Sequence, residues 1–431
     1  MHTIRVPHRK QTAELSAVRL PTPDTVVIPT SMHIGAPARP IVTVGDRVKL
    51  GDVIAEPSSF VSSYVHASVS GTVTRIGAVL LSNGSYGEAI TVKSDGSSEY
   101  AESVTPPTVN SHASFIEAVK RSGAVGLGGA GFPTVVKLSP KDLSLIDTVI
   151  INGAECEPYI TSDTRTMLER PHDVAEGVLL LRRYLGIKRV ILAIENNKPL
   201  CIEAMKHALG DTAEVMSLPS RYPQGGEKVL IYNTVGRVLE EGKLPIDVGV
   251  IVLNCTTLAF IAAYLRTGLP LVEKCVTVDG GAVKEPKNVI APIGTPVSAL
   301  FEFCGGFTED PDRLLYGGPM MGITLPTLDT PILKNTNAIL ALTKKETRSL
   351  APSACIRCGA CQRACPMGLM PTMLADAFEK SDCDSLARLK ANLCMECGCC
   401  AFVCPAHRPI VQKNRLAKRA LAGYLKERKN K

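Results

Sequence analysis

The chain has 431 residues, 45% of them apolar, a length and composition that suit two to four globular domains with buried cores. Its net charge of +7 is modest for this size, and only 4% of the residues are aromatic, so nucleic acid is not indicated as a partner. The uncharged, largely apolar run at residues 248–264 is too short and too polar for a membrane-spanning helix. We expect it to form a buried strand, a turn and a helix.

Residues 1–105 have the pattern of a small all-β unit. Short strands separated by Gly, Pro and Ser are expected at 25–29, 41–44, 53–55, 71–76 and 89–92. The stretches 44–55 and 65–73 resemble biotinyl and lipoyl carrier domains, which fold as a barrel-sandwich hybrid. Carriers place a modifiable lysine between these stretches, but residues 57–61 contain none. We therefore expect a carrier-shaped unit that serves structure or docking.

A linker at 102–111 and a helix predicted at 115–121 lead to a glycine-rich loop. The loop contains Gly126, Gly128, Gly129, Gly131 and Phe132, and Lys137 follows it. It satisfies G-x-G-x-x-G, but the dinucleotide fingerprint requires a strand directly before the loop, where a helix is expected here. Glycine amides can approach a phosphate closely and a lysine can add charge, so a phosphate site and a simple turn-rich loop both remain open.

The next segment predicts an α/β domain. An apolar strand near 149–151 ends in a polar elbow that contains Asn152, Glu155 and Glu157, and ligands of open α/β sheets bind at such strand ends. Helices expected at 173–184 and 200–209 alternate with strands at 189–194 and 249–253, which favours a mainly parallel sheet covered on both faces. Gly226 and Glu227 lie in a turn of this segment, and Asn254 and Thr257 follow its last strand.

Residues 269–330 predict a further small unit. It has a strand at 274–278, a turn at 280–281, a helix at 298–304 and a glycine-rich block at 317–322 that closes the unit.

Eight of the fifteen cysteines form two copies of one run, C-x2-C-x2-C-x3-C-P. This run is the signature of bacterial two-cluster ferredoxins, in which the fourth cysteine of each run binds the other cluster. We therefore assign Cys355, Cys358, Cys361 and Cys404 to one [4Fe-4S] cluster, and Cys394, Cys397, Cys400 and Cys365 to the second.

The turns inside the two runs require special backbone geometry, and we expect positive φ angles at Gly359 and Gly398. Structural zinc usually takes two short cysteine pairs, so it fits two runs of four less well. A disulfide framework is weaker still, because the N-terminus has no signal-peptide pattern and we expect a reducing cytoplasm. Cys383 and Cys399 are expected to be spare thiols.

Residues 408–431 carry nine Lys or Arg against one Glu, on a predicted short helix. Such a basic tail can dock on an anionic membrane surface or an acidic partner, and a solvated helix end explains it equally well.

Four of these stretches, the glycine loop, the elbow, the turn at 225–227 and residues 254–257, occur in the order seen in the flavin subunit of respiratory complex I. Residues 195–199, 222–228 and 317–322 more closely resemble blocks of the C subunit of the Rnf complex, and this resemblance covers nearly the whole chain. It implies that FMN and NADH are bound by Gly126, Gly128, Gly129, Gly131, Phe132, Lys137, Asn152, Glu155, Gly226, Glu227, Asn254 and Thr257. Phe132 and Glu157 would face the dinucleotide, with Glu157 as the catalytic residue. Ala154 and Lys228 stand where the complex I protein has acids.

The resemblance implies a multidomain α/β protein. Its expected parts are a barrel-sandwich hybrid at 1–105, a Rossmann-like domain for FMN and NADH at 112–268, a soluble ligand-binding β-grasp domain at 269–330, and an α-helical ferredoxin-like domain with two [4Fe-4S] clusters at 345–431. The β-grasp domain either binds a ligand or serves as a rigid spacer.

The implied function is that of a peripheral electron-transfer subunit on the cytoplasmic face of the cell membrane. It would exchange electrons between NADH, FMN and the clusters, with a ferredoxin-like cytoplasmic subunit and integral membrane flavoprotein subunits as partners that couple the reaction to Na+ or H+ transport. One alternative is a soluble flavin/iron-sulfur reductase that serves a corrinoid protein or an amino-acid reductase. Another is a non-enzymatic iron-sulfur relay without flavin. Corrinoid reductases place the carrier-like module after the clusters, whereas here it comes first, which favours the Rnf complex.

Overall fold

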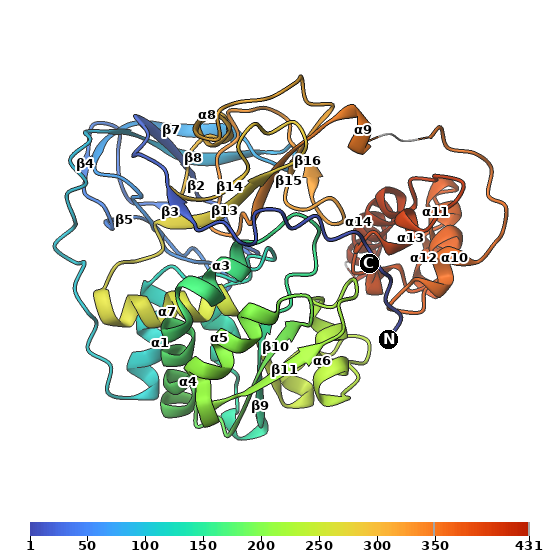
Figure 1. Ribbon diagram of the computed structural model, residues 1–431, viewed down its shortest axis with the longest axis horizontal. Coiled ribbons are helices and arrows are strands. Elements are labelled where there is room, and N and C mark those ends of the chain that lie inside the picture. Colours follow the sequence, from blue (N-terminus) through green and yellow to red (C-terminus); the bar gives the residue numbers. More distant parts are fainter. Residues whose placement is uncertain (348–349, 430–431) are drawn as a thin grey trace.

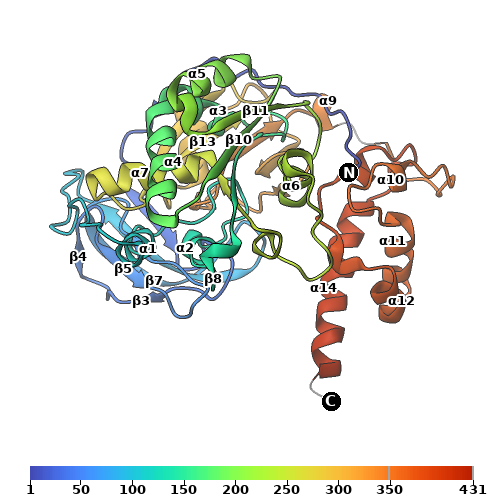
Figure 2. The same cartoon turned by 90° about the horizontal axis from the view of Figure 1, so that it is seen from below.

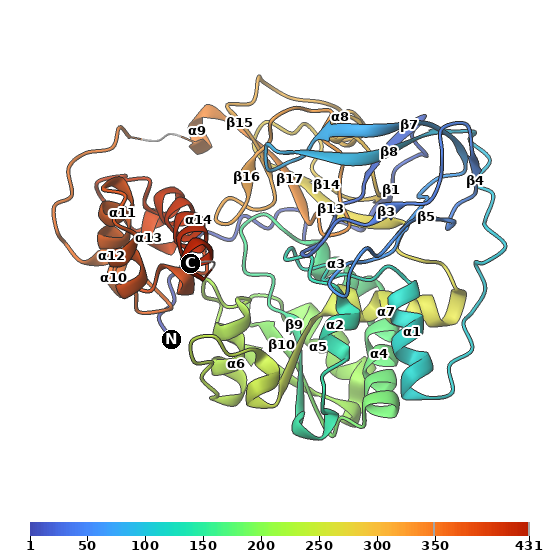
Figure 3. The ribbon, with the colours of Figure 1, turned by 180° about the vertical axis from the view of Figure 1, so that it is seen from behind.

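The computed structural model describes residues 1–347 and 350–429 and folds into four units (Figure 1). Figure 3 shows that the first and third units lie side by side on the α/β unit, while the C-terminal helices form a separate body at one end. Within the described residues, no helix has the length and apolar character needed to cross a bilayer.

The first unit consists of two small antiparallel sheets around one apolar core, which includes Val26, Ile54 and Ile90. The larger sheet has the order β2 (Thr25–Pro29), β8 (Tyr86–Ser94), β7 (Gly71–Leu80) and β4 (Arg47–Val48), and the smaller has β3 (Arg39–Pro40), β5 (Val53–Glu56) and β6 (Val65–His66). The strand predicted at 41–44 is wrong. The strand β3 ends at Pro40, and the amide of Ile41 makes one further bond to Ile54 (3.0 Å). Ile41 and Val44 are 47% and 60% exposed, and Val42 is the residue of this run that packs against the core.

The first 17 residues, which we call the N-terminal strap, leave the first unit and run along the α/β unit. Ile4 forms an antiparallel bridge with Tyr222, and the N-terminus lies beside the C-terminal helices (Figure 1). The next residues form β1 (Val18–Arg19), which pairs with a strand of the third unit. The strap therefore contacts parts of the chain that are far from it in sequence.

The α/β unit has the parallel sheet that the sequence predicts. Its strand order is β11 (Glu214–Leu218), β10 (Arg189–Glu195), β9 (Thr148–Gly153) and β12 (Val250–Asn254). Alternate residues of β9 face opposite sides: Val149 and Ile151 pack into one core, and Ile150 packs into the other. The first core is covered by α1 (His112–Arg121), α4 (Pro171–Leu185), α5 (Pro199–Leu209) and α7 (Cys255–Thr267), and the second by α6 (Glu227–Val235). The sheet is thus covered on both faces.

Two further helices of this unit flank the predicted site. They are α2 (Thr134–Leu138), which follows the glycine loop, and α3 (Ser162–Glu169), which follows the elbow. As expected, the element that precedes the glycine loop is the helix α1 and not a strand. Short 3-10 turns occur at Leu143–Leu145, Gly210–Thr212, Pro245–Val248 and, in the C-terminal unit, Ala391–Leu393.

The third unit is a six-stranded mixed sheet covered by α8 (Val297–Phe303). Its order is β1, β14 (Lys287–Pro292), β13 (Glu273–Asp279), β17 (Ala338–Leu342), β15 (Arg313–Tyr316) and β16 (Ile323–Thr324). The expected strand and helix are present, and the block at 317–322 is the hairpin between β15 and β16. The sheet also recruits β1 and β17 from outside the range 269–330.

The C-terminal unit is an internal repeat with an offset of 39 residues, the spacing between Cys355 and Cys394. Its helices are α10 (Ala360–Arg363), α11 (Pro371–Glu379), α12 (Cys383–Arg388), α13 (Cys399–Phe402) and α14 (Ile410–Lys429), preceded by α9 (Lys344–Thr347). Helix α10 corresponds to α13, and α11 starts at the position that corresponds to the start of α14. The repeated cysteine pattern is therefore also a repeat of structure.

Helix α14 spans 20 residues and is longer than the short helix predicted for the basic tail. It buries Ala417 and Leu421 against α11 and α12, and its last turns project beyond the neighbouring helices (Figure 2). Basic residues in and just before α14 pair with acids of the same unit: Arg408 with Asp376, Lys413 with Glu379, Arg415 and Lys418 with Glu396, and Arg428 with Asp384. Much of the positive charge of the tail is thus paired internally.

Candidate functional site

The glycine loop is attached to the end of β12. The amide of Gly126 donates to the carbonyl of Phe132 (2.8 Å), which closes the loop, and the amide of Leu127 donates to Thr257 Oγ1 (2.8 Å). Gly128 lies against Asn254: a Cβ at this position would be 3.0 Å from the amide nitrogen of Asn254. Asn254 also caps α7 by accepting from the amide of Thr257 (3.2 Å). A side chain at position 128 would therefore crowd the side chain of Asn254.

The elbow, residues 152–160, meets the turn at 225–227 at the same edge of the sheet. Asn152 Nδ2 donates to the carbonyl of Gly225 (2.9 Å). Lys137 Nζ donates to Glu227 Oε1 (2.8 Å) and to the carbonyl of Val252 (3.1 Å). The four blocks singled out in the sequence are therefore brought together at the carboxyl ends of the strands, where α/β proteins bind ligands.

Glu155 directs its carboxylate at the N-terminus of α3. It accepts from the backbone amides of Asp163 (2.6 Å) and Thr164 (3.3 Å) and from the hydroxyl of Thr164. Burial raises the pKa of Glu155, and the nearby ammonium group of Lys10 opposes this effect. The carboxylate is therefore part of the frame of the elbow.

Asp163 connects this frame to the glycine loop, and sequence reasoning missed it. Its carboxylate accepts from Asn254 Nδ2 (2.7 Å) and Thr256 Oγ1 (2.6 Å). The signal was present, because Thr161, Ser162 and Asp163 are residues that favour a helix start.

Two largely buried lysines donate hydrogen bonds to the backbone of the elbow. The sequence analysis did not predict either role. Lys10 of the strap donates to the carbonyls of Glu155 (2.7 Å), Glu157 (2.9 Å) and Ile160. Lys198 donates to the carbonyl of Ala154 (2.7 Å). Burial lowers the pKa of Lys10 to about 8. Because most of these acceptors are backbone carbonyls, no side-chain pattern marks the partners.

The carboxylate of Glu157 lies between the α/β unit and the hairpin at 317–322. It accepts from the amides of Met320 (3.1 Å) and Met321 (2.8 Å), and the hydroxyl of Tyr222 lies 3.4 Å from its Oε1. Burial raises the pKa of Glu157 to about 7. The catalytic role of Glu157 toward the dinucleotide stays a prediction, since its visible partners belong to the hairpin and to Tyr222.

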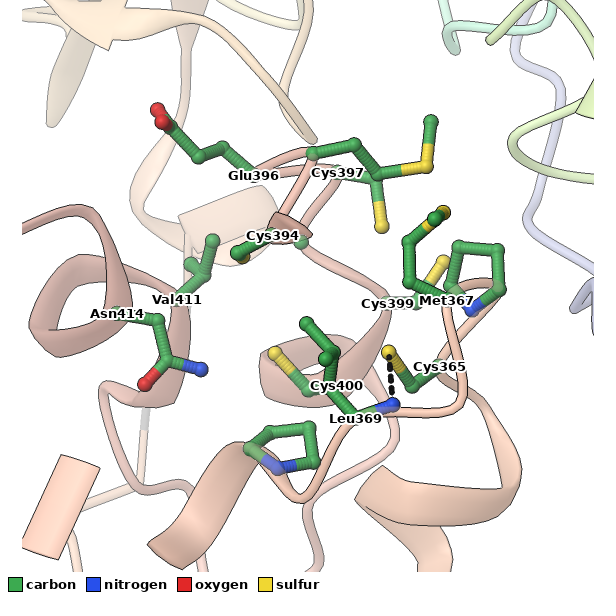
Figure 4. A pocket seen from close by; sticks show the side chains of 14 residues that line it. Cys365, Met367, Leu369, Cys394, Glu396, Cys397, Cys399, Cys400, Val411 and Asn414 are labelled. Atoms are coloured by element: carbon green, nitrogen blue, oxygen red, sulfur yellow. Dashed lines mark hydrogen bonds between the residues drawn. The ribbon is translucent and has the colours of Figure 1, made fainter. Parts of the chain in front are cut away.

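The four cysteines assigned to the second cluster line one pocket, which we call the cysteine pocket. Figure 4 shows the side chains of Cys365, Cys394, Cys397 and Cys400 around it. The amide of Leu369 donates to Cys365 Sγ (3.4 Å). Four thiols that converge from both runs are the donor set that a [4Fe-4S] cluster requires, so the residues fit the group.

The turns of the two runs have the expected geometry. Gly359 and Gly398 have φ angles of 72° and 80°, as predicted, and each begins the short helix that carries the third cysteine. Cys399 is fully buried beside Tyr222, outside the predicted ligand set.

The cysteines assigned to the first cluster are more open. Cys355 and Cys358 are exposed, whereas Cys361 and Cys404 pack together against Ile410 and Val411. Across residues 1–347 and 350–429, no three His, Cys, Asp or Glu side chains are grouped closely enough to hold a single metal ion. Both ligand sets stay predictions.

Four family models match the chain in the order of its units. Residues 2–97 match the RnfC barrel sandwich hybrid domain, and residues 119–263 match the Nuo51 FMN-binding domain of complex I. Residues 275–324 match the SLBB domain, and residues 350–369 match a 4Fe-4S binding domain.

Curated relatives match nearly the full length. The C subunit of the proton-translocating ferredoxin:NAD+ oxidoreductase complex of Clostridium ljungdahlii is 44% identical over 85% of this chain and 81% of its own length. The C subunit of the Na+-translocating complex of Acetobacterium woodii is 42% identical over 97% of this chain and 96% of its own. The C subunit of the ion-translocating oxidoreductase complex of Rhodobacter capsulatus is 41% identical over 98% and 82%.

Solved structures show a shared fold. The air-oxidized NAD+-reducing [NiFe]-hydrogenase has a TM-score of 0.52 at 17% identity, and the match covers 72% of this chain and 63% of that chain. Together with the relatives, the matched domains identify the family. This chain belongs to the RnfC family, the C subunits of the ion-translocating ferredoxin:NAD+ oxidoreductase known as the Rnf complex.

Proposed function

We propose that this chain is the peripheral electron-transfer subunit of a membrane-bound NAD:ferredoxin oxidoreductase of the Rnf type. In this role it exchanges electrons between NADH, FMN and two [4Fe-4S] clusters. The names of its relatives and the match to an FMN-binding domain and a 4Fe-4S domain support this function.

One observation carries the proposal: the candidate flavin site and the cysteine pocket share Tyr222. The hydroxyl of Tyr222 donates to the carbonyl of Cys397 (2.7 Å) and lies 3.4 Å from Glu157 of the elbow. In this proposal, Tyr222 joins the site for two-electron chemistry to the site for one-electron carriers.

The residues at the strand ends suit a flavin nucleotide. FMN, when bound, supplies the exchange between two-electron and one-electron chemistry. Lys137 places a positive charge beside the glycine loop, and Lys10 and Lys198 place two more behind the elbow. Glycine amides and fixed cations are the donors that a phosphate group requires.

The difference in exposure between the two cysteine sets suggests an order. The cysteine pocket adjoins the α/β unit, whereas Cys355 and Cys358 face solvent. We infer that the second set takes electrons from the flavin side and the first set faces a partner. That partner would be a ferredoxin-like cytoplasmic subunit, and integral membrane flavoprotein subunits would complete the complex, move Na+ or H+ and anchor this chain to the cytoplasmic face.

We also propose that the chain has four domains, at residues 1–105, 112–268, 269–330 and 345–431. The second has a Rossmann-like fold and the third a β-grasp fold. The match of residues 2–97 to the RnfC barrel sandwich hybrid domain, ahead of the flavin and cluster regions, favours membership of the complex over a soluble reductase.

The test is anaerobic purification followed by cofactor analysis and NADH titration. We expect one non-covalent FMN and about eight iron atoms per chain, and loss of the flavin absorbance on addition of NADH. Flavin-loaded protein that NADH does not bleach would refute the NADH role. Protein that holds both clusters but binds no added FMN would instead support the non-enzymatic relay.

A further inference from the structure

A segment from outside the predicted site, residues 334–337, passes directly over the glycine loop. It lies in the third unit, between β16 and β17. Asn335 Nδ2 donates to the carbonyl of Gly129 (2.7 Å), and a Cβ at Gly131 would lie 2.9 Å from the same nitrogen. Asn337 Nδ2 lies 3.9 Å from a Cβ built at Gly129. The glycine loop is therefore held between Asn254 and this segment.

Alternate residues of the segment have different roles. Lys334 is fully buried and donates to the carbonyls of Gly123 (2.8 Å) and Tyr64, and Thr336 Oγ1 accepts from the amide of Leu333 (2.8 Å). These two residues anchor the segment. Asn335 lies in a turn that the amide of Thr336 closes by donating to the carbonyl of Leu333 (3.1 Å), and Asn337 follows this turn; both side chains come next to the loop.

Both asparagines leave an oxygen without a partner. The Oδ1 atoms of Asn335 and Asn337 are shielded from solvent, and among the residues that the structure describes neither accepts a hydrogen bond. A buried amide oxygen without a donor costs free energy, and such atoms in folded proteins are nearly always paired. Two such oxygens on one segment, beside one glycine-rich loop, indicate a ligand that donates hydrogen bonds there.

We propose that Asn335 and Asn337 are FMN-binding residues whose Oδ1 atoms accept hydrogen bonds from the flavin held on the glycine loop. This inference rests on the proposed function. An ionised phosphate offers acceptors and few donors, so the asparagines match the hydroxyl groups of the ribityl chain or the ring N–H of the flavin. The site is thus completed by a segment that lies beyond the matched FMN-binding region at 119–263.

The sharpest test is Asn337→Ala, because the Asn337 side chain makes no hydrogen bond within the described part of the chain. The purified full-length protein is diluted, and the recovery of free FMN fluorescence gives the dissociation constant. We expect FMN binding to weaken about five- to tenfold, the effect of losing one hydrogen bond. Without added FMN, the unfolding temperature of the variant should equal or exceed that of the wild type, because an unpaired buried oxygen is removed. A purely structural role would lower the unfolding temperature instead.

Asn335→Ala should weaken FMN binding by more than Asn337→Ala does, because it also removes the bond to Gly129. Thr330→Val is the matched control. It removes another buried, unpaired oxygen from the same stretch of chain, while its backbone contact is with Val297 at the start of α8. We expect this variant to bind FMN like the wild type.

The outcomes separate this inference from the proposed function. Wild-type FMN affinity in both asparagine variants would overturn the inference while leaving the flavin site intact. Unchanged FMN affinity with a raised KM for NADH would also overturn it and assign the asparagines to the dinucleotide. Failure of the wild-type protein to bind FMN would refute the proposed function itself.

Discussion

The hydroxyl of Tyr222 donates a hydrogen bond to the backbone carbonyl of Cys397 at 2.7 Å, and this bond crosses from the α/β unit to the cysteine pocket. The ring of Tyr222 is fully buried, and its backbone pairs with Ile4 of the N-terminal strap. Three separate parts of the chain therefore meet at one tyrosine.

Replacing Tyr222 with Phe should change the second cluster without emptying it. The carbonyl of Cys397 would lose its donor, so we expect unfolding to become easier by about 1 to 3 kcal/mol and the iron content to stay unchanged. The reduction potential of the buried cluster should shift to lower values, because a nearby hydrogen-bond dipole is lost. Redox titration followed by electron paramagnetic resonance measures the shift.

Tyr184→Phe is the control for this variant. Its hydroxyl donates to the carbonyl of Val109 (2.9 Å), a contact between α4 and the linker at 102–111. It should lower stability by a similar amount and leave both potentials unchanged. A potential shift of equal size in both variants would contradict a specific role for Tyr222.

Substitutions of the cysteines should group by cluster and not by run. Cys365 lines the pocket with Cys397, although the two belong to different runs. We expect Cys365→Ser and Cys397→Ser to remove the same resonance signal and about four iron atoms, whereas Cys404→Ser and Cys355→Ser should remove the other signal. If the single variants Cys365→Ser and Cys355→Ser instead removed the same signal, each run would hold its own cluster. Cys383→Ser should change neither signal.

Lys137→Met should weaken FMN binding by at least about tenfold, because a cation beside the glycine loop is removed. The ion pair with Glu227 is partly exposed, so the free energy of unfolding should change by about 1 kcal/mol or less. Arg237→Met is the control, since Arg237 pairs with Asp147 (2.7 Å) elsewhere in the same unit. Fluorescence of released FMN distinguishes the two variants, and equal affinities would contradict a role for Lys137 in binding.

Glu157→Gln should alter how stability depends on pH. Burial raises the pKa of Glu157 from 4.5 to about 7, so the folded state keeps a proton that the unfolded state has already released. Its contribution to stability is full at low pH and is lost as the pH rises through about 7. Glutamine does not titrate and keeps an acceptor oxygen for the amides of Met320 and Met321.

We therefore expect the glutamine variant to match the wild type near pH 4, below the pKa of the unfolded state, and to exceed its stability near pH 8 by up to about 3 kcal/mol. Urea unfolding at the two pH values measures this difference. An equal difference at both values would contradict a raised pKa for Glu157.

The parts of the molecule that local sequence determines were predictable. The spacing of the cysteines follows from the chemistry of the cluster, and Gly359 and Gly398 adopt the positive φ angles that tight turns around the ligands require. The parallel sheet was also predictable, because its strands are buried on both faces and appear as continuous apolar runs such as 149–151.

Contacts between distant segments were not predictable in the same way. Lys10 and Lys198 are ordinary lysines in the sequence, and their acceptors are mainly backbone carbonyls that every residue carries. The strand expected at 41–44 is wrong because the prediction used only the apolar pattern of these residues. In the fold, no core faces Ile41 and Val44. The internal ion pairs of α14 likewise depend on which helices pack beside it.

The N-terminal strap has a consequence for dissecting the protein. A fragment limited to residues 112–268 would include every FMN-binding residue that the sequence predicts, but it would lack Asn335, Asn337 and the ammonium group of Lys10. The carbonyls of Glu155, Glu157 and Ile160 would then lose their shared donor, and Tyr222 would lose the backbone partner that Ile4 provides. We therefore expect the smallest autonomous folding unit to be discontinuous in sequence and to extend beyond residues 112–268.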